Sequence, residues 1–175
     1  MVGLSRNEVA LEAHDSSWRE TYREEAQRLR KLVGDRVEAI EHVGSTAVPG
    51  IPAKPIIDVL VVVGDGQTDA VAAELGANGY DRRPNDDVPD RVFLARGPPD
   101  CRTHYLSLVE SDSDCHREQV AFRDYLRDHS AVATAYAALK RELAAEYPEN
   151  REAYTAEKSA FVEDVLDRAL PEYAP

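Results

Sequence analysis

At 175 residues the chain has the length of one domain, and its 43% of hydrophobic residues is ordinary for a globular protein, which excludes wholesale disorder. Its formal net charge is −12, with 33 acidic residues against 21 basic ones, and a surface of this sign repels long nucleic acids. No apolar run approaches the roughly 18 residues of a membrane span, and the N-terminus lacks the apolar core of a signal peptide, so we expect a cytoplasmic protein without membrane contacts.

The basic residues are mostly arginine, since the chain has 17 arginines and only four lysines. Abundant aspartate with scarce lysine resembles the composition of proteins from salt-loving archaea, whose acidic side chains keep the surface hydrated in concentrated salt. The composition therefore predicts a stability that rises with molar KCl.

The first predicted element is a helix over residues 17–33. An apolar stripe at helical spacing supports it, formed by Trp18, Tyr22, Ala26, Leu29 and Val33. We expect the Ser17 hydroxyl to cap its N-terminus, with Glu20 completing a capping box. Gly34 follows as the stop signal.

Strands dominate the middle of the chain. Alternating residues predict a strand over 36–43, and a near-continuous aliphatic run predicts a second over 56–63, covered on both faces. Between them, residues 44–54 have the composition of a structured loop. A helix over 68–77 follows, and then further strands at residues 80–83, 91–96 and 102–109. Residues 84–90 form a polar, acidic loop that we expect to be exposed.

Beyond residue 114 the pattern is helical, with helices expected over 114–128, 131–147 and 150–170. Strands grouped before helices favour an α+β fold over a regular βαβ alternation. We therefore predict a single domain over residues 1–175, with a sheet-forming part over about 1–110 and a helical part over about 114–170.

The two cysteines are too few for a disulfide framework. Cys101 and His104, followed by Cys115 and His116, have the composition of a zinc site. Adjacent residues such as Cys115 and His116 do not easily face one tetrahedral ion, so we expect two reduced thiols instead.

The segment over residues 41–58 concentrates side chains suited to phosphate chemistry. A predicted strand ends at Gly44, where a backbone without Cβ lets a ligand approach closely. Ser45 and Thr46 follow, with hydroxyls and with N–H groups able to form an anion-binding concavity. Asp58 then lies inside an aliphatic strand, where an aspartate is costly unless it is paired, metal-bound or open to a cleft.

This segment resembles the motif of the GrpB-like family and, through it, that of the nucleotidyltransferase superfamily, which places Gly-Ser on one strand and an aspartate on the next. Further stretches resemble the family's helical half, namely residues 122–127, 136–140 and 154–158. The resemblance covers nearly the whole chain and implies a nucleotidyltransferase-like mixed sheet packed with helices. It also implies that Gly44 and Ser45 hold the terminal phosphates of a nucleotide. Asp58, the expected catalytic residue, would hold Mg²⁺ or Mn²⁺ bridging those phosphates.

One departure from the superfamily pattern bears on activity. Active nucleotidyltransferases carry a second acid two residues after the first, and here that position is Leu60. Two-metal phosphoryl transfer needs enough carboxylates to fix both ions. Glu41 and Glu110, each at a predicted strand end, are the candidates for a second metal ligand, with solvated rim charges as the alternative.

Two histidines are candidate site residues. His42 directly precedes the motif, and His104 lies in the strand predicted over 102–109. If their strands neighbour that of Asp58, the three side chains could share one site as ligands or proton carriers. The family resemblance implies a further histidine where this chain has Ser107, which weakens a two-histidine role. A hydrogen-bonded core histidine is the alternative for His104.

Three of the four lysines, Lys54, Lys140 and Lys158, fall inside segments that resemble the family's motifs. A compact ammonium group that reaches a phosphate would explain their retention in an arginine-rich chain, and ordinary surface lysines are the alternative. Arg123, opposite the apolar face of its predicted helix, is a further candidate ligand-binding residue.

Two functions follow for this site. The first is a metal-dependent nucleotidyltransferase that uses a nucleoside triphosphate and an acceptor that the sequence does not identify. The second is a non-catalytic accessory protein that binds a nucleotide or a phosphorylated metabolite, which the leucine at position 60 favours. The family resemblance also links the chain to coenzyme A metabolism, because GrpB-like domains occur fused to dephospho-CoA kinase.

Overall fold

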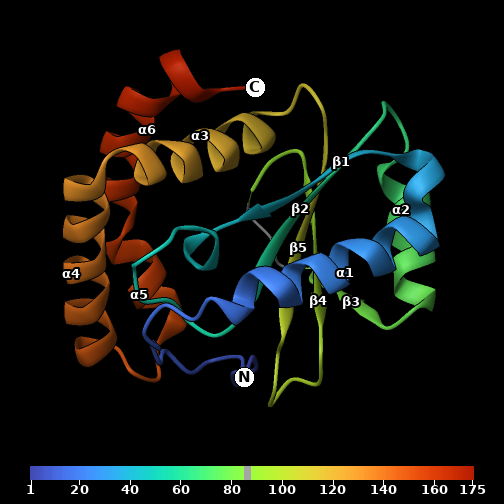
Figure 1. Cartoon of the computed structure of the whole chain (residues 1–175). Helices are drawn as coiled ribbons and strands as arrows, with labels where there is room; N and C mark the ends of the chain where they lie inside the picture. Colours follow the sequence, from blue (N-terminus) through green and yellow to red (C-terminus); the bar gives the residue numbers. More distant parts are fainter. Residues whose placement is uncertain (85–87) are drawn as a thin grey trace.

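The computed structural model describes residues 1–84 and 88–175, and in these residues a five-stranded mixed sheet packs with six α-helices (Figure 1). The strands are β1 (Val37–Val43), β2 (Ile57–Val63), β3 (Tyr80–Arg82), β4 (Arg91–Arg96) and β5 (His104–Glu110). The helices are α1 (Ser17–Val33), α2 (Thr68–Ala77), α3 (Asp114–Asp128), α4 (Ser130–Glu146), α5 (Arg151–Glu157) and α6 (Ser159–Tyr173). A short 3₁₀ turn, η2 (Ser45–Ala47), follows β1. The predicted α+β class is confirmed.

The strands lie in the order β1-β2-β5-β4-β3. β2 and β5 are parallel, and every other neighbouring pair is antiparallel. Both β2 and β5 are interior strands, which explains their near-continuous aliphatic sequences. The predicted loop over 84–90 joins β3 to β4; residues 85–87 lie outside the described part, and residues 84 and 88–90 are exposed.

The two faces of the sheet carry separate apolar clusters, because successive side chains of a strand point to opposite faces. One face of β2 packs against α1 and α2 through Ile57, Val59, Val61 and Val63. Its other face packs against α3, where Leu60 and Val62 lie with Val120. Asp58 belongs to this second face, since it alternates with Ile57 and Val59 along the strand.

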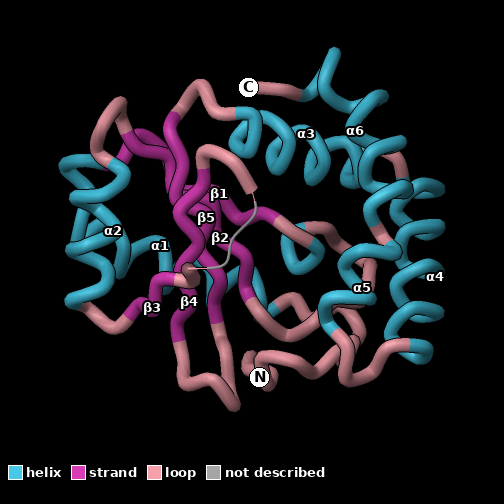
Figure 2. The backbone as a smooth tube through the Cα atoms, turned by 180° about the vertical axis from the view of Figure 1, so that it is seen from behind, coloured by secondary structure: helices cyan, strands magenta, loops and turns pink. Residues whose placement is uncertain are grey.

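The C-terminal helices form a group beside the sheet. Figures 1 and 2 show α4, α5 and α6 together on the side of the molecule opposite α2, with α3 reaching from the sheet toward them. α3 joins the two parts, because Val120 packs on the sheet while Ala121 and Tyr125 pack on Val165 and Ala169 of α6. None of the described helices is long and apolar enough to cross a membrane.

Two details differ from the sequence prediction. α1 has the predicted bounds, but its N-cap residue is Ser16, whose side chain makes no capping hydrogen bond. Asp15 Oδ1 accepts a hydrogen bond from the Ser17 N–H at 2.8 Å, and Glu20 forms an ion pair with Arg23 within the helix. The predicted capping box is therefore wrong. The helix expected over 150–170 is divided at Lys158 into α5 and α6, which places that lysine at a joint between two helices.

Candidate functional site

The bend after β1 lies directly against Asp58. Val43, the last residue of β1, pairs with Asp58 of β2, so the chain leaves the sheet beside that carboxylate. Gly44 has a φ of +70°, and a Cβ at this position would overlap Asp58 Oδ2 and lie 3.0 Å from Asp58 Cγ. Only glycine fits such a backbone so close to a neighbouring side chain. The predicted juxtaposition of Gly44, Ser45 and Asp58 is therefore present.

Three lysines converge on this bend from three segments of the chain. Lys140 of α4 donates to Ser45 Oγ at 2.8 Å and to the Pro52 carbonyl oxygen, which fixes the hydroxyl that the sequence predicted as a phosphate ligand. The ammonium nitrogens of Lys54 and Lys158 lie 5.3 and 4.4 Å from the centre of the Tyr154 ring.

The charges of these lysines and of Asp58 act on one another, as expected for groups in one cluster. Burial, followed by mutual repulsion among the cations, lowers the pKa of Lys54 to about 8 and that of Lys140 to about 7. Burial also lowers the pKa of Lys158 to about 8, against the opposing effect of the Asp58 charge. The pKa of Asp58 is raised by burial, while Lys54, Arg151 and Lys158 act to lower it. A cluster in which cations outnumber the carboxylate attracts an anionic ligand.

Arg151, the first residue of α5, is the site residue that the sequence did not indicate. Its guanidinium lies 4.9 Å from the centre of the Tyr105 ring, and its Nη1 donates to Tyr105 Oη at 3.3 Å. Tyr105 pairs with Asp58 across the parallel β2–β5 ladder, which places Arg151 in the same cluster. One arginine among 17 carries no local signal, so only the docking of α5 reveals it.

The position of the missing second acid is closed to a metal ion. Leu60 is fully buried among Val43, Val62, Val109 and Val120. Glu41 pairs with Leu60 across the β1–β2 ladder and so shares the face of Asp58, but its Oε2 accepts from Arg123 Nη1 at 2.5 Å.

Glu110, the other candidate metal ligand, lies at the far end of β5, where it pairs with Val63 and accepts from the Gly66 N–H at 2.8 Å. The suggestion that it could join Asp58 is wrong, because five strand positions separate them. Its neighbours are Asp65 and Asp112, the one close group of metal-ligating side chains in the described residues.

The residues present do not by themselves fit a resident divalent ion. Mg²⁺ and Mn²⁺ prefer hard oxygen ligands and carboxylates. Here Asp58 supplies one carboxylate, and Lys54, Lys158 and Arg151 surround it with charge of the ion's own sign. An ion at Asp58 would need the oxygens of a phosphate ligand to complete its coordination. The assignment of Asp58 and Glu41 as metal ligands stays a prediction.

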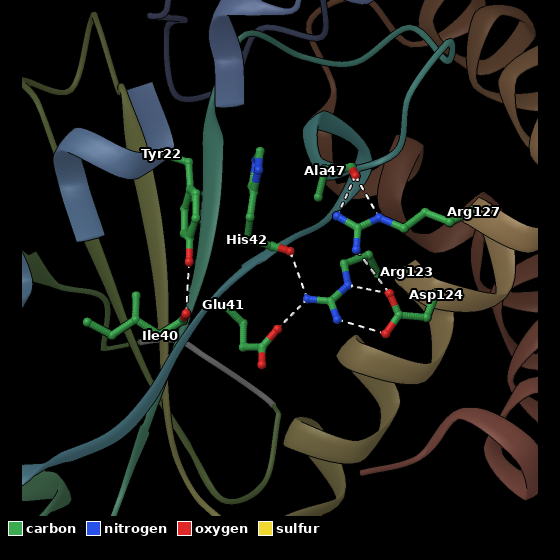
Figure 3. A network of polar contacts seen from close by, with 8 residues as sticks. All are labelled: Tyr22, Ile40, Glu41, His42, Ala47, Arg123, Asp124 and Arg127. Atoms are coloured by element: carbon green, nitrogen blue, oxygen red, sulfur yellow. Dashed lines mark hydrogen bonds and ion pairs between the residues drawn. The ribbon is translucent and has the colours of Figure 1, made fainter. Parts of the chain in front are cut away.

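Two arginines of α3 form hydrogen bonds to the backbone on both sides of the bend, as Figure 3 shows. Arg123 Nη1 donates to the His42 carbonyl oxygen at 3.1 Å, while its Nε and Nη2 each lie 2.8 Å from the Asp124 carboxylate. Arg127 Nε and Nη2 donate to the Ala47 carbonyl oxygen at 3.0 and 2.9 Å. Arg123, predicted to bind ligand, is thus buried and engaged with the protein.

The two histidines lie on the face of the sheet opposite Asp58. His42 pairs with Val59 and His104 with Ile57, and both partners belong to the α1 and α2 face. The strands are neighbours, as the sequence prediction required, but the two-residue alternation of side chains separates the histidines from Asp58. The expected shared site is therefore wrong.

Each histidine has internal partners instead. His42 stacks on Tyr22 with ring centres 4.7 Å apart (Figure 3). Its Nε2 lies 2.9 Å from Thr46 Oγ, so the hydroxyl of Thr46, a predicted ligand-binding residue, contacts the protein. Burial, followed by Arg127 and Arg123, lowers the pKa of His42 to about 4. His104 Nδ1 lies 2.9 Å from Thr103 Oγ, and burial lowers its pKa as well. Both histidines are therefore neutral residues of the packed interior, which is the alternative given above for His104.

The cysteines do not assemble a zinc site. Cys101 is exposed, whereas Cys115 is buried against the sheet in the α3 cluster, and no disulfide joins them. His116 Nδ1 lies 2.8 Å from the Ser111 carbonyl oxygen, in a contact at the start of α3. This arrangement agrees with the expectation of two reduced thiols.

Comparison with known proteins places the chain in a family. The model of the GrpB protein family matches residues 8–168. The glutamate-rich protein GrpB of Alkalihalophilus pseudofirmus is 34% identical over 173 residues, which cover 95% of this chain and 99% of that protein. The crystal structure of the conserved protein GrpB from Enterococcus faecalis superposes with a TM-score of 0.84 and 34% identity, over 93% of this chain and 98% of that one.

A more distant likeness concerns the fold alone. The Cid1 poly(U) polymerase, in a structure with Mg 3′-dATP bound, superposes with a TM-score of 0.54 and 12% identity over 83% of this chain and 49% of that one. The predicted nucleotidyltransferase-like fold is therefore confirmed. The family model and the GrpB relatives together show that this chain is a member of the GrpB family.

Proposed function

We propose that the protein binds the phosphate groups of a nucleotide or another phosphorylated small molecule at the bend formed by Gly44 and Ser45. The observation that carries this proposal is the convergence of three of the four lysines on the bend, in a chain whose net charge is −12. Bringing mutually repelling ammonium groups together in a half-buried place destabilises the free protein. Binding of an anionic ligand would compensate the charge of the ammonium groups and so explain why they lie together.

The geometry suits phosphate oxygens. The absence of a Cβ at Gly44 lets the bend lie directly against the Asp58 carboxylate, and Lys140 holds the Ser45 hydroxyl in place. Lys54 and Lys158 are half-buried, whereas Lys140 is buried. Charge-assisted hydrogen bonds from ammonium groups to phosphate are among the stronger polar interactions in proteins.

Ligand-dependent thermal stability tests the proposal. We expect nucleoside triphosphates, or coenzyme A and its phosphorylated precursors, to raise the melting temperature. At a ligand concentration about 100-fold above Kd, the free energy of unfolding should rise by roughly 2.7 kcal/mol. Adenosine, which has no phosphate, is the matched control. If no phosphorylated compound stabilises the protein more than adenosine does, the proposal is wrong.

A metal-dependent nucleotidyltransferase is the second candidate function. The fold likeness to Cid1 favours it, as does the placement of Glu41 on the same sheet face as Asp58. In this alternative Asp58 would hold a Mg²⁺ or Mn²⁺ ion that arrives with a nucleoside triphosphate. An acceptor hydroxyl or other nucleophile would attack the α-phosphate, and pyrophosphate would leave.

Pyrophosphate release tests this alternative. We expect release that depends on Mg²⁺ or Mn²⁺ and vanishes in the variant Asp58→Ala, with Asp65→Ala, in the turn after β2, as the control. Protein that binds a nucleotide yet releases no pyrophosphate across a broad acceptor screen would exclude catalysis and leave the binding function.

A further inference from the structure

We infer that Lys54, Lys140 and Lys158 neutralise a triphosphate group directly, so that the site binds its ligand free of divalent metal. This inference rests on the proposed phosphate binding and specifies the ligand's charge state. The ligand class is a linear triphosphate, either inorganic or carried by a nucleoside.

The first support is the balance of charge. The three lysines, Arg151 and, with a smaller effect, Arg91 act on a single carboxylate, that of Asp58. Cations that outnumber the carboxylate leave an excess of positive charge, which a metal-free triphosphate compensates better than its magnesium complex does, because the bound ion removes charge from the phosphates. In the free protein, the Asp58 carboxylate partly balances the lysines.

The second support is the way the ammonium groups are held. The Tyr154 ring is 1% exposed, and the ammonium groups of Lys54 and Lys158 both lie near its centre, in the arrangement of a cation–π contact. Lys140 lies 4.8 Å from the centre of the Tyr136 ring and is fixed by its bonds to Ser45 and the loop. Cations held in place before the ligand arrives lose little freedom on binding.

The third support is the environment that a divalent ion would meet. The position of a second acid is Leu60, sealed in an apolar cluster. Glu41 is neutralised by Arg123, which is itself buried. A divalent ion at Asp58 therefore has one carboxylate ligand and is repelled by the surrounding ammonium groups. Without the ion, the lysines bind the phosphate oxygens with no competing cation.

Isothermal titration calorimetry at pH 7 tests the inference with two ligands, inorganic triphosphate and ATP, each in EDTA and in excess Mg²⁺. We expect binding in EDTA and about tenfold weaker binding in excess Mg²⁺. Equal affinities for the two ligands would mean that the site recognises the phosphate chain alone, and tighter binding of ATP would mean that the nucleoside is recognised too.

The failing outcomes are distinguishable. Binding that appears only with Mg²⁺ overturns the metal-free inference and leaves phosphate binding intact, which favours the transferase alternative. Absence of binding by any phosphorylated ligand, under either condition, overturns the proposed function as well.

Lysine variants provide the second measurement. Lys54→Gln and Lys158→Gln should each weaken the binding of inorganic triphosphate in EDTA by about tenfold. Both variants should fold, because burial disfavours the charged ammonium group at each position. The matched control is Lys31→Gln, which changes the remaining lysine, exposed on α1, and should leave the affinity unchanged. Equal loss in all three variants would indicate non-specific attraction and overturn the inference.

Discussion

At the scale of single residues, the close approach of Gly44 to Asp58 is the most constrained contact of the site. Gly44 combines a left-handed φ with a position where any Cβ would meet the Asp58 side chain. Gly50 has a similar φ of +82°, but nothing lies within 4 Å of the Cβ it would carry. Comparing alanine substitutions at the two glycines therefore distinguishes the cost of backbone strain from the cost of steric overlap.

We expect Gly50→Ala to cost about 1 kcal/mol through its backbone conformation alone. Gly44→Ala should cost about 1–3 kcal/mol more, because the added methyl group also displaces the Asp58 carboxylate. Urea unfolding of the two variants measures the difference. Equal destabilisation would show that the bend relaxes away from Asp58 without resistance.

The sequence predicted which residues belong to the site better than it predicted the face of the sheet on which each side chain lies. Gly44, Ser45, Asp58 and the lysines carry their signal in residue type and spacing, and the structure brings them together. The histidines were misplaced, because sequence alone does not say which face of the sheet the alternation starts on. Arg151 was missed for a related reason, since its position depends on the docking of α5 against β5.

At the scale of elements, α3 supports the bend through Arg123 and Arg127. The carbonyl oxygens that they bind, those of His42 and Ala47, flank Gly44 and Ser45. α3 thereby fixes the course of the backbone at the site, while its own position depends on contacts with α6. These arginines position the site without contacting its ligand.

Replacing Arg123 by Met should destabilise the protein by about 2–4 kcal/mol, because Glu41 loses its partner. The lower end of this range applies if the Glu41 side chain, 35% exposed, recovers hydration. The double variant with Glu41→Gln should regain a large part of the loss, as measured by urea unfolding.

Arg23→Met is the control for this prediction. It removes an ion pair with Glu20 whose side chains are 52% and 63% exposed, and it should change stability by less than about 0.5 kcal/mol. A cost for Arg123→Met as small as that of the control would mean that α3 does not depend on this pair.

Element boundaries show where local sequence is sufficient. α1 and α2 match their predicted bounds, because apolar spacing and stop signals are local. The division of the last predicted helix at Lys158 was not foreseen, since the residues around it form helices on both sides. Tertiary contacts place the joint there, with Lys158 beside Tyr154 and Asp58.

At the scale of the whole molecule, the lysine cluster sets a pH dependence of stability. The folded-state pKa values of Lys54, Lys140 and Lys158 are about 8, 7 and 8, below the ordinary value of 10.5. Between about pH 7 and 10 the unfolded chain therefore binds more protons than the folded one, and stability rises with pH.

We expect the urea midpoint of the ligand-free protein to increase from pH 7 to pH 9, and the double variant Lys54→Gln, Lys158→Gln to show a weaker increase. The variant should also be more stable than the natural chain at pH 7. A natural chain whose midpoint falls over this range would contradict the assigned coupling.

The net charge of −12 predicts a second dependence for the whole molecule. Salt screens repulsion among surface carboxylates, so the melting temperature should rise as KCl is increased to molar concentrations. Differential scanning calorimetry from dilute buffer to about 2 M KCl measures this rise in melting temperature. Full stability in dilute buffer, with no rise in salt, would contradict the prediction drawn from composition.

The three converging lysines belong to the loop before β2, to α4 and to the joint between α5 and α6, so their origins span most of the chain. During synthesis the ribosome delivers Gly44, Ser45 and Asp58 long before Lys158. A partly made chain thus presents the glycine-serine corner with little positive charge around it. Under the proposed function, binding of a triphosphate is therefore expected only after the last helices have reached the sheet.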